Sequence, residues 1–248
     1  MIIWNTSSFI KRVWYNRWQR KEWKDLAYLN TPVSRQGNFT RYVVYMVLYL
    51  IVLGCRFLGT FNHNFHLFGA VLFVIVAAPV LLFYIRQFNH EQRYFIKGFK
   101  LSFLGDYLFT LGTTFLVIMA RITFSYLQMK GKVPKLNIQV IYASHESNGL
   151  YWFYIFALGI VLPAMQQYLT NGFFFNYFFR ESSATTAVLG ITVSGLFFSI
   201  LNLQFSLEIF IINILFGMIF AWSYLYAQSL WMPVYLSILN GVLMIVLI

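Results

Sequence analysis

Polar side chains that could bind or react interrupt the apolar second half of the chain at four places. They are Gln166 and Gln167 with Asn171, then Asn202, then Asn213, then Ser237 with Asn240. Amides and hydroxyls are costly in hydrocarbon unless something hydrogen-bonds them. They do not ionise near neutral pH, so they can bind a ligand but cannot act as a general base. The pattern therefore allows two interpretations: hydrogen bonds between helices, or a site.

The composition predicts the structure that must position these side chains. The chain has 248 residues, of which 60% are hydrophobic and 10% are charged. Soluble domains carry about 25% charged residues, so this chain cannot cover a water-facing surface. Its apolar runs do not alternate with polar residues, which excludes a β-barrel. We therefore predict an all-α, polytopic transmembrane helix bundle.

Seven apolar runs are long enough to cross a bilayer or nearly so. They cover residues 42–61, 67–85, 101–120 (extendable to 129), 150–169, 185–201, 207–227 and 231–248. Residues 86–100 are interpreted as a basic loop, and Asn176 is placed in the turn that follows the fourth span. No repeat and no low-complexity linker divides residues 42–248, which predicts one transmembrane domain.

Residues 1–41 form a basic segment of a different character. It holds eight of the 18 Lys and Arg residues, which places the N-terminus in the cytoplasm by the positive-inside rule. Trp14 and Trp18 recur at helical spacing with Arg17 between them. This pattern predicts an amphipathic helix anchored at the membrane interface. Its expected partner is anionic lipid and not nucleic acid, because tryptophan occupies the other face.

The first half holds few groups that could ligate a metal or carry protons. Asp106 lies within the third predicted span, where a carboxylate is a functional candidate by default. His63 and His66 lack a nearby acid or cysteine to complete a metal site. Cys55 is the single cysteine, which excludes an internal disulfide. We predict no metal and no cofactor.

The order and spacing of the polar positions resemble the motifs of a known family. QQYLTNGFFFNYF resembles a motif E-E-x-x-x-R followed by Gly and an apolar run, and FFSILN resembles F-x-x-x-H with Asn202 at the histidine. SLWMPVYLSILNGV resembles a closing S-L-W-x-P segment that leads into H-x-x-x-N. Ser237 stands at that histidine, Gly241 at the asparagine, and Asn240 one residue early. Residues 150–248 thus resemble the CAAX-protease and bacteriocin-processing family of intramembrane metalloproteases.

The resemblance implies a site that has lost its catalytic groups. In active members the first glutamate and the two histidines hold or activate a water, together with a metal. Gln166 cannot accept a proton as that glutamate does, and Asn202 and Ser237 are poor ligands for a transition metal. Gln167 and Asn171 replace a carboxylate–guanidinium pair with two amides, which can still hydrogen-bond without a buried charge. We expect no catalytic residue.

Three functions follow as hypotheses. The favoured one is a catalytically inactive family member that binds or regulates a membrane protein or a membrane-embedded peptide, as a scaffold, a regulator or a bacteriocin-immunity protein. Gln166, Asn171, Asn202 and Asp106 are the candidate contacts. The alternatives are an active CAAX-type or leader-peptide endopeptidase with a non-standard site, and a transporter or transporter subunit. The expected location is the bacterial cytoplasmic membrane, with several spans.

Overall fold

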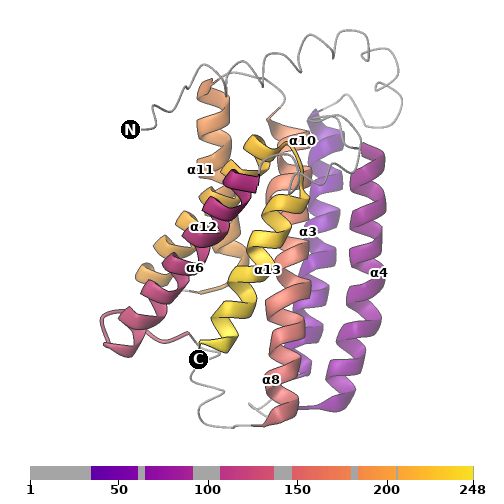
Figure 1. The fold of residues 1–248 in the computed structure, drawn as a ribbon. Coiled ribbons are helices and arrows are strands. Elements are labelled where there is room, and N and C mark those ends of the chain that lie inside the picture. Colours follow the sequence, from indigo (N-terminus) through magenta and orange to yellow (C-terminus); the bar gives the residue numbers. More distant parts are fainter. Residues whose placement is uncertain are drawn as a thin grey trace, which may run out of the picture.

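The computed structural model describes residues 35–60, 65–91, 107–136, 147–179, 184–204 and 206–247. Within these ranges the chain forms seven helical rods and no strand (Figure 1). The rods are α3 (Arg35–Leu58), α4 (Leu67–Glu91), α6 (Tyr107–Met129), the α8–α10 rod (Asn148–Phe178), α11 (Ala184–Leu201), α12 (Leu207–Ala227) and α13 (Trp231–Val246). The predicted transmembrane bundle is confirmed.

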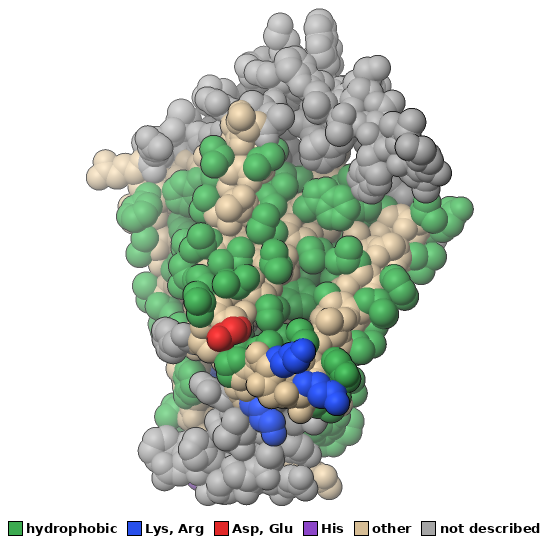
Figure 2. Space-filling model, turned by 90° about the vertical axis from the view of Figure 1, so that its left-hand side faces the viewer, with side chains coloured by type: hydrophobic (Ala, Val, Ile, Leu, Met, Phe, Trp, Pro, Cys, Tyr) green, Lys and Arg blue, Asp and Glu red, His purple; other side chains and the backbone are tan. Residues whose placement is uncertain are grey.

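Five of the rods are long and apolar enough to cross a membrane by themselves. They are α3, α4, α6, the α8–α10 rod and α12, whereas α11 and α13 are apolar but shorter. Figure 2 shows one face of the molecule covered by apolar side chains over most of its height, with the described charged side chains near its lower end. Leu111 and Phe115 of α6 and Leu215 of α12 are each more than half exposed. Such side chains face lipid in a protein of this class.

Several predicted boundaries were wrong by one or two helical turns. α3 begins at Arg35 and not at residue 42. α4 continues to Glu91, although residues 86–91 were assigned to a loop. The fourth span continues to Phe178, which places Asn176 inside a helix and not in a turn. A hydropathy pattern marks only the apolar part of a helix, whereas these helices end in polar residues that are paired inside the bundle.

Two groups of helices make up the bundle. α3 and α4 pack together and against the α8–α10 rod, and α11 packs along α12 (Figure 1). α13 joins the groups, because it contacts α6, α12 and the α8–α10 rod. The antiparallel pair α11 and α12 approaches closely at glycines. A Cβ atom on Gly217 would lie 2.8 Å from the Cα atom of Gly195, which illustrates how small residues let membrane helices touch.

Aromatic side chains fill the core between α3, α4 and the upper half of the α8–α10 rod. The rings of Tyr45 and Phe173 have their centroids 4.4 Å apart, and Phe173 meets Tyr84 edge to face at 5.7 Å. Ring pairs in such geometries add stability beyond the area they bury. This core holds the rod that carries Gln166 in a fixed position.

Candidate functional site

The helix that carries Gln166 and Gln167 is interrupted on both sides. Both residues belong to α9 (Leu162–Gln167), which lies between two π-helical segments, η2 (Ile155–Val161) and η3 (Tyr168–Phe173). π-Helical turns are rare and occur often at functional sites. Pro163 stands in α9, inside the continuous rod Asn148–Phe178, where its missing N–H removes one intrahelical hydrogen bond. The motif region thus coincides with the most irregular part of the bundle.

Gln166 connects three helices through one tyrosine. Its Nε2 donates to Tyr49 Oη at 2.9 Å, and Tyr49 Oη donates to the carbonyl of Leu201 at 3.4 Å. Gln166 and Tyr49 are both buried. α9, α3 and the end of α11 therefore meet at this point. The side chain of Tyr49 thus links the first motif, through Gln166, to the second motif, which ends at Asn202.

Gln167 and Asn171 form an amide–amide hydrogen bond, which the comparison with the family's carboxylate–guanidinium pair had allowed. Asn171 Nδ2 donates to Gln167 Oε1 at 2.5 Å. Ser194 Oγ of α11 lies 2.9 Å from Asn171 Oδ1 and 2.8 Å from the Thr170 carbonyl, both of which can accept its proton. Gln167 Nε2 is buried and has no acceptor in the described part of the chain. The cluster links the α8–α10 rod to α11 without any formal charge.

The third motif packs directly against α9. Ser237 Oγ of α13 lies 3.5 Å from the Pro163 carbonyl, to which it donates a long hydrogen bond. A Cβ atom on Gly241 would lie 2.9 Å from the carbonyl oxygens of Leu158 and Gly159. Gly241 therefore allows α13 to touch the π-helical segment. Close packing is the role that the structure shows for this position.

The remaining predicted residues contribute differently. Asn202 Nδ2 donates to the Phe198 carbonyl of its own helix at 2.8 Å. Asn240 is buried, and its Oδ1 has no hydrogen-bond donor among the described residues. Asp106 and the interfacial residues Trp14, Arg17 and Trp18 lie outside the described residues.

We call Gln166, Gln167, Asn171, Asn202, Ser237, Asn240 and Gly241 the degenerate site. Its side chains do not fit the metal that the resemblance implies. Zinc binds imidazole, thiolate and carboxylate groups, whereas this set offers amides and a hydroxyl. The side chains of Gln166, Asn202 and Ser237 already hydrogen-bond to protein groups. Within the described ranges, no three His, Cys, Asp or Glu side chains gather where they could hold a metal ion.

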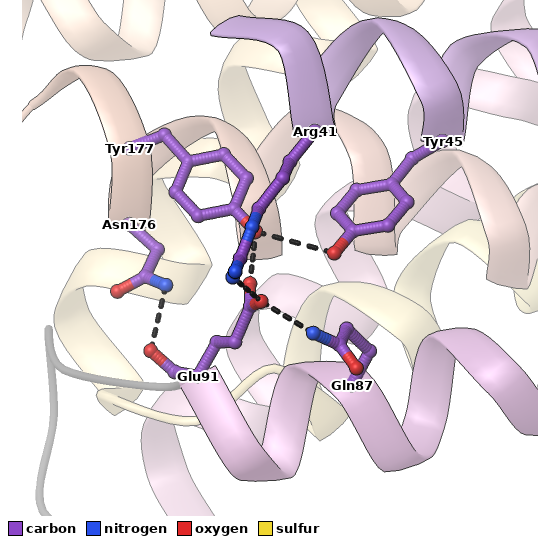
Figure 3. A network of polar contacts seen from close by, with 6 residues as sticks. All are labelled: Arg41, Tyr45, Gln87, Glu91, Asn176 and Tyr177. Atoms are coloured by element: carbon purple, nitrogen blue, oxygen red, sulfur yellow. Dashed lines mark hydrogen bonds and ion pairs between the residues drawn. The ribbon is translucent and has the colours of Figure 1, made fainter. Parts of the chain in front are cut away.

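A second polar cluster, which sequence reasoning missed, surrounds Glu91 at the upper end of the bundle (Figure 3). The Glu91 carboxylate accepts hydrogen bonds from Arg41 of α3 at 2.5 Å, from Gln87 one turn earlier, and from Tyr177 of α10. Tyr45 Oη lies 3.4 Å from Tyr177 Oη.

The Glu91 cluster connects α3, α4 and α10 through hydrogen bonds. Asn176 Nδ2 donates to the Glu91 carbonyl at 2.8 Å and so adds a backbone contact to the carboxylate contacts. A sequence signal for part of this cluster exists, because Gln87 and Glu91 are four residues apart and share one helix face. The interpretation of residues 86–100 as a loop is incompatible with that helical pairing of Gln87 and Glu91. Each oxygen of the Glu91 carboxylate accepts a hydrogen bond from at least one of these side chains. Such an arrangement is typical of a cluster that holds helices together.

Two arginines are buried in the spanning helices and form no ion pair with a carboxylate of the described residues. The Arg121 guanidinium lies over the rings of Phe124 and Phe216, at 5.2 and 5.8 Å. The Arg56 guanidinium lies over Phe57 and Tyr154, at 4.8 and 5.6 Å. The Nε atom of each arginine is buried without a hydrogen-bond acceptor in the described part of the chain.

Comparison with known proteins finds a similarity for the part of the chain that carries the degenerate site. Residues 148–243 match the family model described as type II CAAX prenyl endopeptidase Rce1-like. The match begins in α8 and ends in α13, so it includes all the positions of the degenerate site. No curated protein and no solved structure matches the chain significantly. Residues 148–243 are therefore similar to the Rce1-like family of type II CAAX prenyl endopeptidases.

Proposed function

We propose that this chain is a catalytically inactive Rce1-like membrane protein that binds a membrane-embedded peptide or a partner membrane protein at the degenerate site. One observation carries the proposal. The positions where the family resemblance places a base and metal ligands hold Gln166, Asn202 and Ser237, which are neutral and hydrogen-bonded to the surrounding helices. The scaffold is kept, while the groups that hold a metal and move a proton are replaced.

The chemistry of these replacements favours binding over hydrolysis. A hydrolytic site needs a base, an activated water and stabilisation of the developing charge at one place. Amides and hydroxyls supply donors and acceptors for a peptide backbone, and Gln167 Nε2 and Asn240 Oδ1 are still without partners among the described residues. Each of these two atoms could pair with a peptide group, which offers both an acceptor and a donor. The expected roles are those of a scaffold, a regulator or an immunity protein in the cell membrane, with a cytoplasmic N-terminus.

Catalysis and metal binding are tested on the purified protein. The protein is extracted in mild detergent, its transition-metal content is measured by mass spectrometry, and it is incubated with prenylated and leader-type peptides. We expect a metal content well below one per chain and no cleavage product. A stoichiometric metal together with cleavage would establish the alternative, an active endopeptidase with a non-standard site.

Binding is tested by photo-crosslinking in the native membrane. A photoreactive amino acid replaces Asn202, which is half-buried at the end of α11, and a control variant carries it at Ile200, which is 48% exposed on the same helix. We expect Asn202 to give one defined adduct and Ile200 to give lipid adducts. Mass spectrometry of the adduct identifies the partner as a peptide or a protein. Equal patterns at the two positions would remove the degenerate site as the binding surface.

A further inference from the structure

Arg56 is a buried cation whose partner is absent from the described residues. It stands in the last turn of α3, is 7% exposed, and forms no ion pair with a described acid. Its buried Nε has no acceptor within the described ranges. A guanidinium inside a spanning helix is costly and is normally paired with a carboxylate or with backbone carbonyls. The rings of Phe57 and Tyr154 below it stabilise the charge in part, but they leave its donors unused.

A second unsatisfied group lies next to Arg56. Tyr154 of α8 is fully buried, and its Oη forms no hydrogen bond of normal geometry among the described residues, although Thr60 lies nearby. Buried polar groups are nearly always paired, so each exception calls for an explanation. A guanidinium can only donate, and a tyrosine hydroxyl can donate as well. Two neighbouring donors without an acceptor indicate a missing acceptor with more than one oxygen atom.

The neighbourhood selects a carboxylate as that acceptor. The planar guanidinium binds a carboxylate through two parallel hydrogen bonds, and this pairing is stronger than a neutral contact. Arg56 is close enough to Tyr49 and Tyr154 to interact electrostatically with both hydroxyls. Tyr49 in turn accepts the hydrogen bond of Gln166. A ligand that reaches Arg56 therefore lies only one tyrosine away from the degenerate site.

We propose that Arg56, Tyr154 and Thr60 bind the carboxylate of a membrane-embedded ligand. The site lies where α3 ends and α8 begins, at the lower end of the bundle (Figure 1). Arg56 forms the paired hydrogen bonds, and the Tyr154 hydroxyl donates to the same carboxylate. The proposal goes beyond the proposed function, because it stands whether or not the degenerate site is catalytic. A peptide C-terminus and a fatty acid share this chemistry, and the test separates them.

The experiment measures binding and thermal stability of the full chain in nanodiscs of a neutral phospholipid. The lipidic probes are dodecanoic acid and dodecanol, and the peptide probes are acetyl-Leu-Leu-Leu with a free and with an amidated C-terminus. We expect an acid to bind about 10- to 100-fold more tightly than its neutral counterpart, as one charge-assisted contact of this kind contributes. The pair that shows this preference identifies the source of the carboxylate.

Variants connect the preference to the named residues. Arg56→Met should abolish the preference and raise Tm in the absence of ligand, because it removes an unpaired buried charge. Tyr154→Phe should fold normally and reduce the preference, so the test survives if Arg56→Met fails to fold. Arg86→Met is the matched control, since Arg86 is exposed on α4 and its loss should change nothing.

Three results would overturn the proposal. One is equal binding of acid and neutral probes by the wild type. Another is an undiminished preference in both the Arg56→Met and the Tyr154→Phe variants. The third is a lower Tm in Arg56→Met than in the wild type without ligand, since that result would show Arg56 to be paired within its own chain.

Discussion

The ion pair between Arg41 and Glu91 is unequally exposed, and this predicts an unequal response to mutation. The Arg41 side chain is 40% exposed, whereas the Glu91 side chain is fully buried. Arg41→Gln leaves a buried carboxylate without its cation. Glu91→Gln instead leaves a guanidinium that can turn toward water. The two substitutions remove the same ion pair but leave very different groups behind.

The expected loss of unfolding free energy depends on which group is left without its partner in each variant. Removing one partner of a buried pair costs about 3–5 kcal/mol, and Gln87 and Tyr177 still donate to Glu91 in Arg41→Gln. We therefore expect a loss near the lower limit, about 3 kcal/mol. A pair with one exposed partner contributes about 0.2–1 kcal/mol, and one mismatched hydrogen bond in Glu91→Gln adds about 1 kcal/mol. The expected loss for Glu91→Gln is thus about 1–2 kcal/mol.

The assay is equilibrium unfolding in mixed dodecyl maltoside and SDS micelles, followed by circular dichroism. The double variant Arg41→Gln/Glu91→Gln should be as stable as Glu91→Gln alone, because no buried charge remains to be paired. Arg86→Gln, at an exposed position of the same helix as Glu91, serves as the control for a lost arginine. If Glu91→Gln proves as destabilising as Arg41→Gln or more so, the reasoning from exposure is refuted.

Three further changes test the packing of the degenerate site, each measured by the same unfolding assay. Gly241→Ala places a methyl group 2.9 Å from two carbonyl oxygens and should lower the free energy of unfolding by about 1–3 kcal/mol. In the control Gly54→Ala the methyl group meets no atom within 4 Å, so the stability should not change. Equal effects of the two substitutions would contradict the proposed close contact. Asn171→Leu removes the partner of Gln167 and should cost about 1–3 kcal/mol; an unchanged stability would show that these hydrogen bonds contribute nothing net. Tyr49→Phe should cost about 1–3 kcal/mol by leaving an amide unpaired, and a more stable variant would count against the three-helix junction.

The sequence predicted the helical bundle and the order of its spans because both depend on long apolar runs. It also allowed Gln167 and Asn171 to hydrogen-bond to each other, since residues four apart share a helix face. These features are local, and composition or spacing alone determines them. The family match over residues 148–243 confirms the resemblance that the polar motif positions suggested.

The Glu91 cluster and the π-helical segments could not be predicted in the same way. Glu91 is paired with Arg41, which lies 50 residues earlier in the chain. The spacing of residue types along a helix cannot predict such a distant contact. The polar residues at these helix ends hydrogen-bond to one another. A hydropathy pattern alone would assign such polar residues to a loop. The segment η2 packs near Gly159 against Gly241 of α13, and only the packed structure defines such a contact between distant parts of the chain.

The two π-helical segments also bear on how this helix could change over time. A π turn holds one residue more than an α turn closes around, so an α-helix that gains a residue by insertion can absorb it there without breaking. The reverse also holds, because the loss of one residue from η2 could tighten a π turn to an α turn and leave the helix beyond it in its orientation. Gln166 and Gln167 would then keep their neighbours, whereas a deletion in a regular α-helix would turn them by about 100°. The π-helical segments thus allow the length of this rod to vary without changing the direction of its polar face.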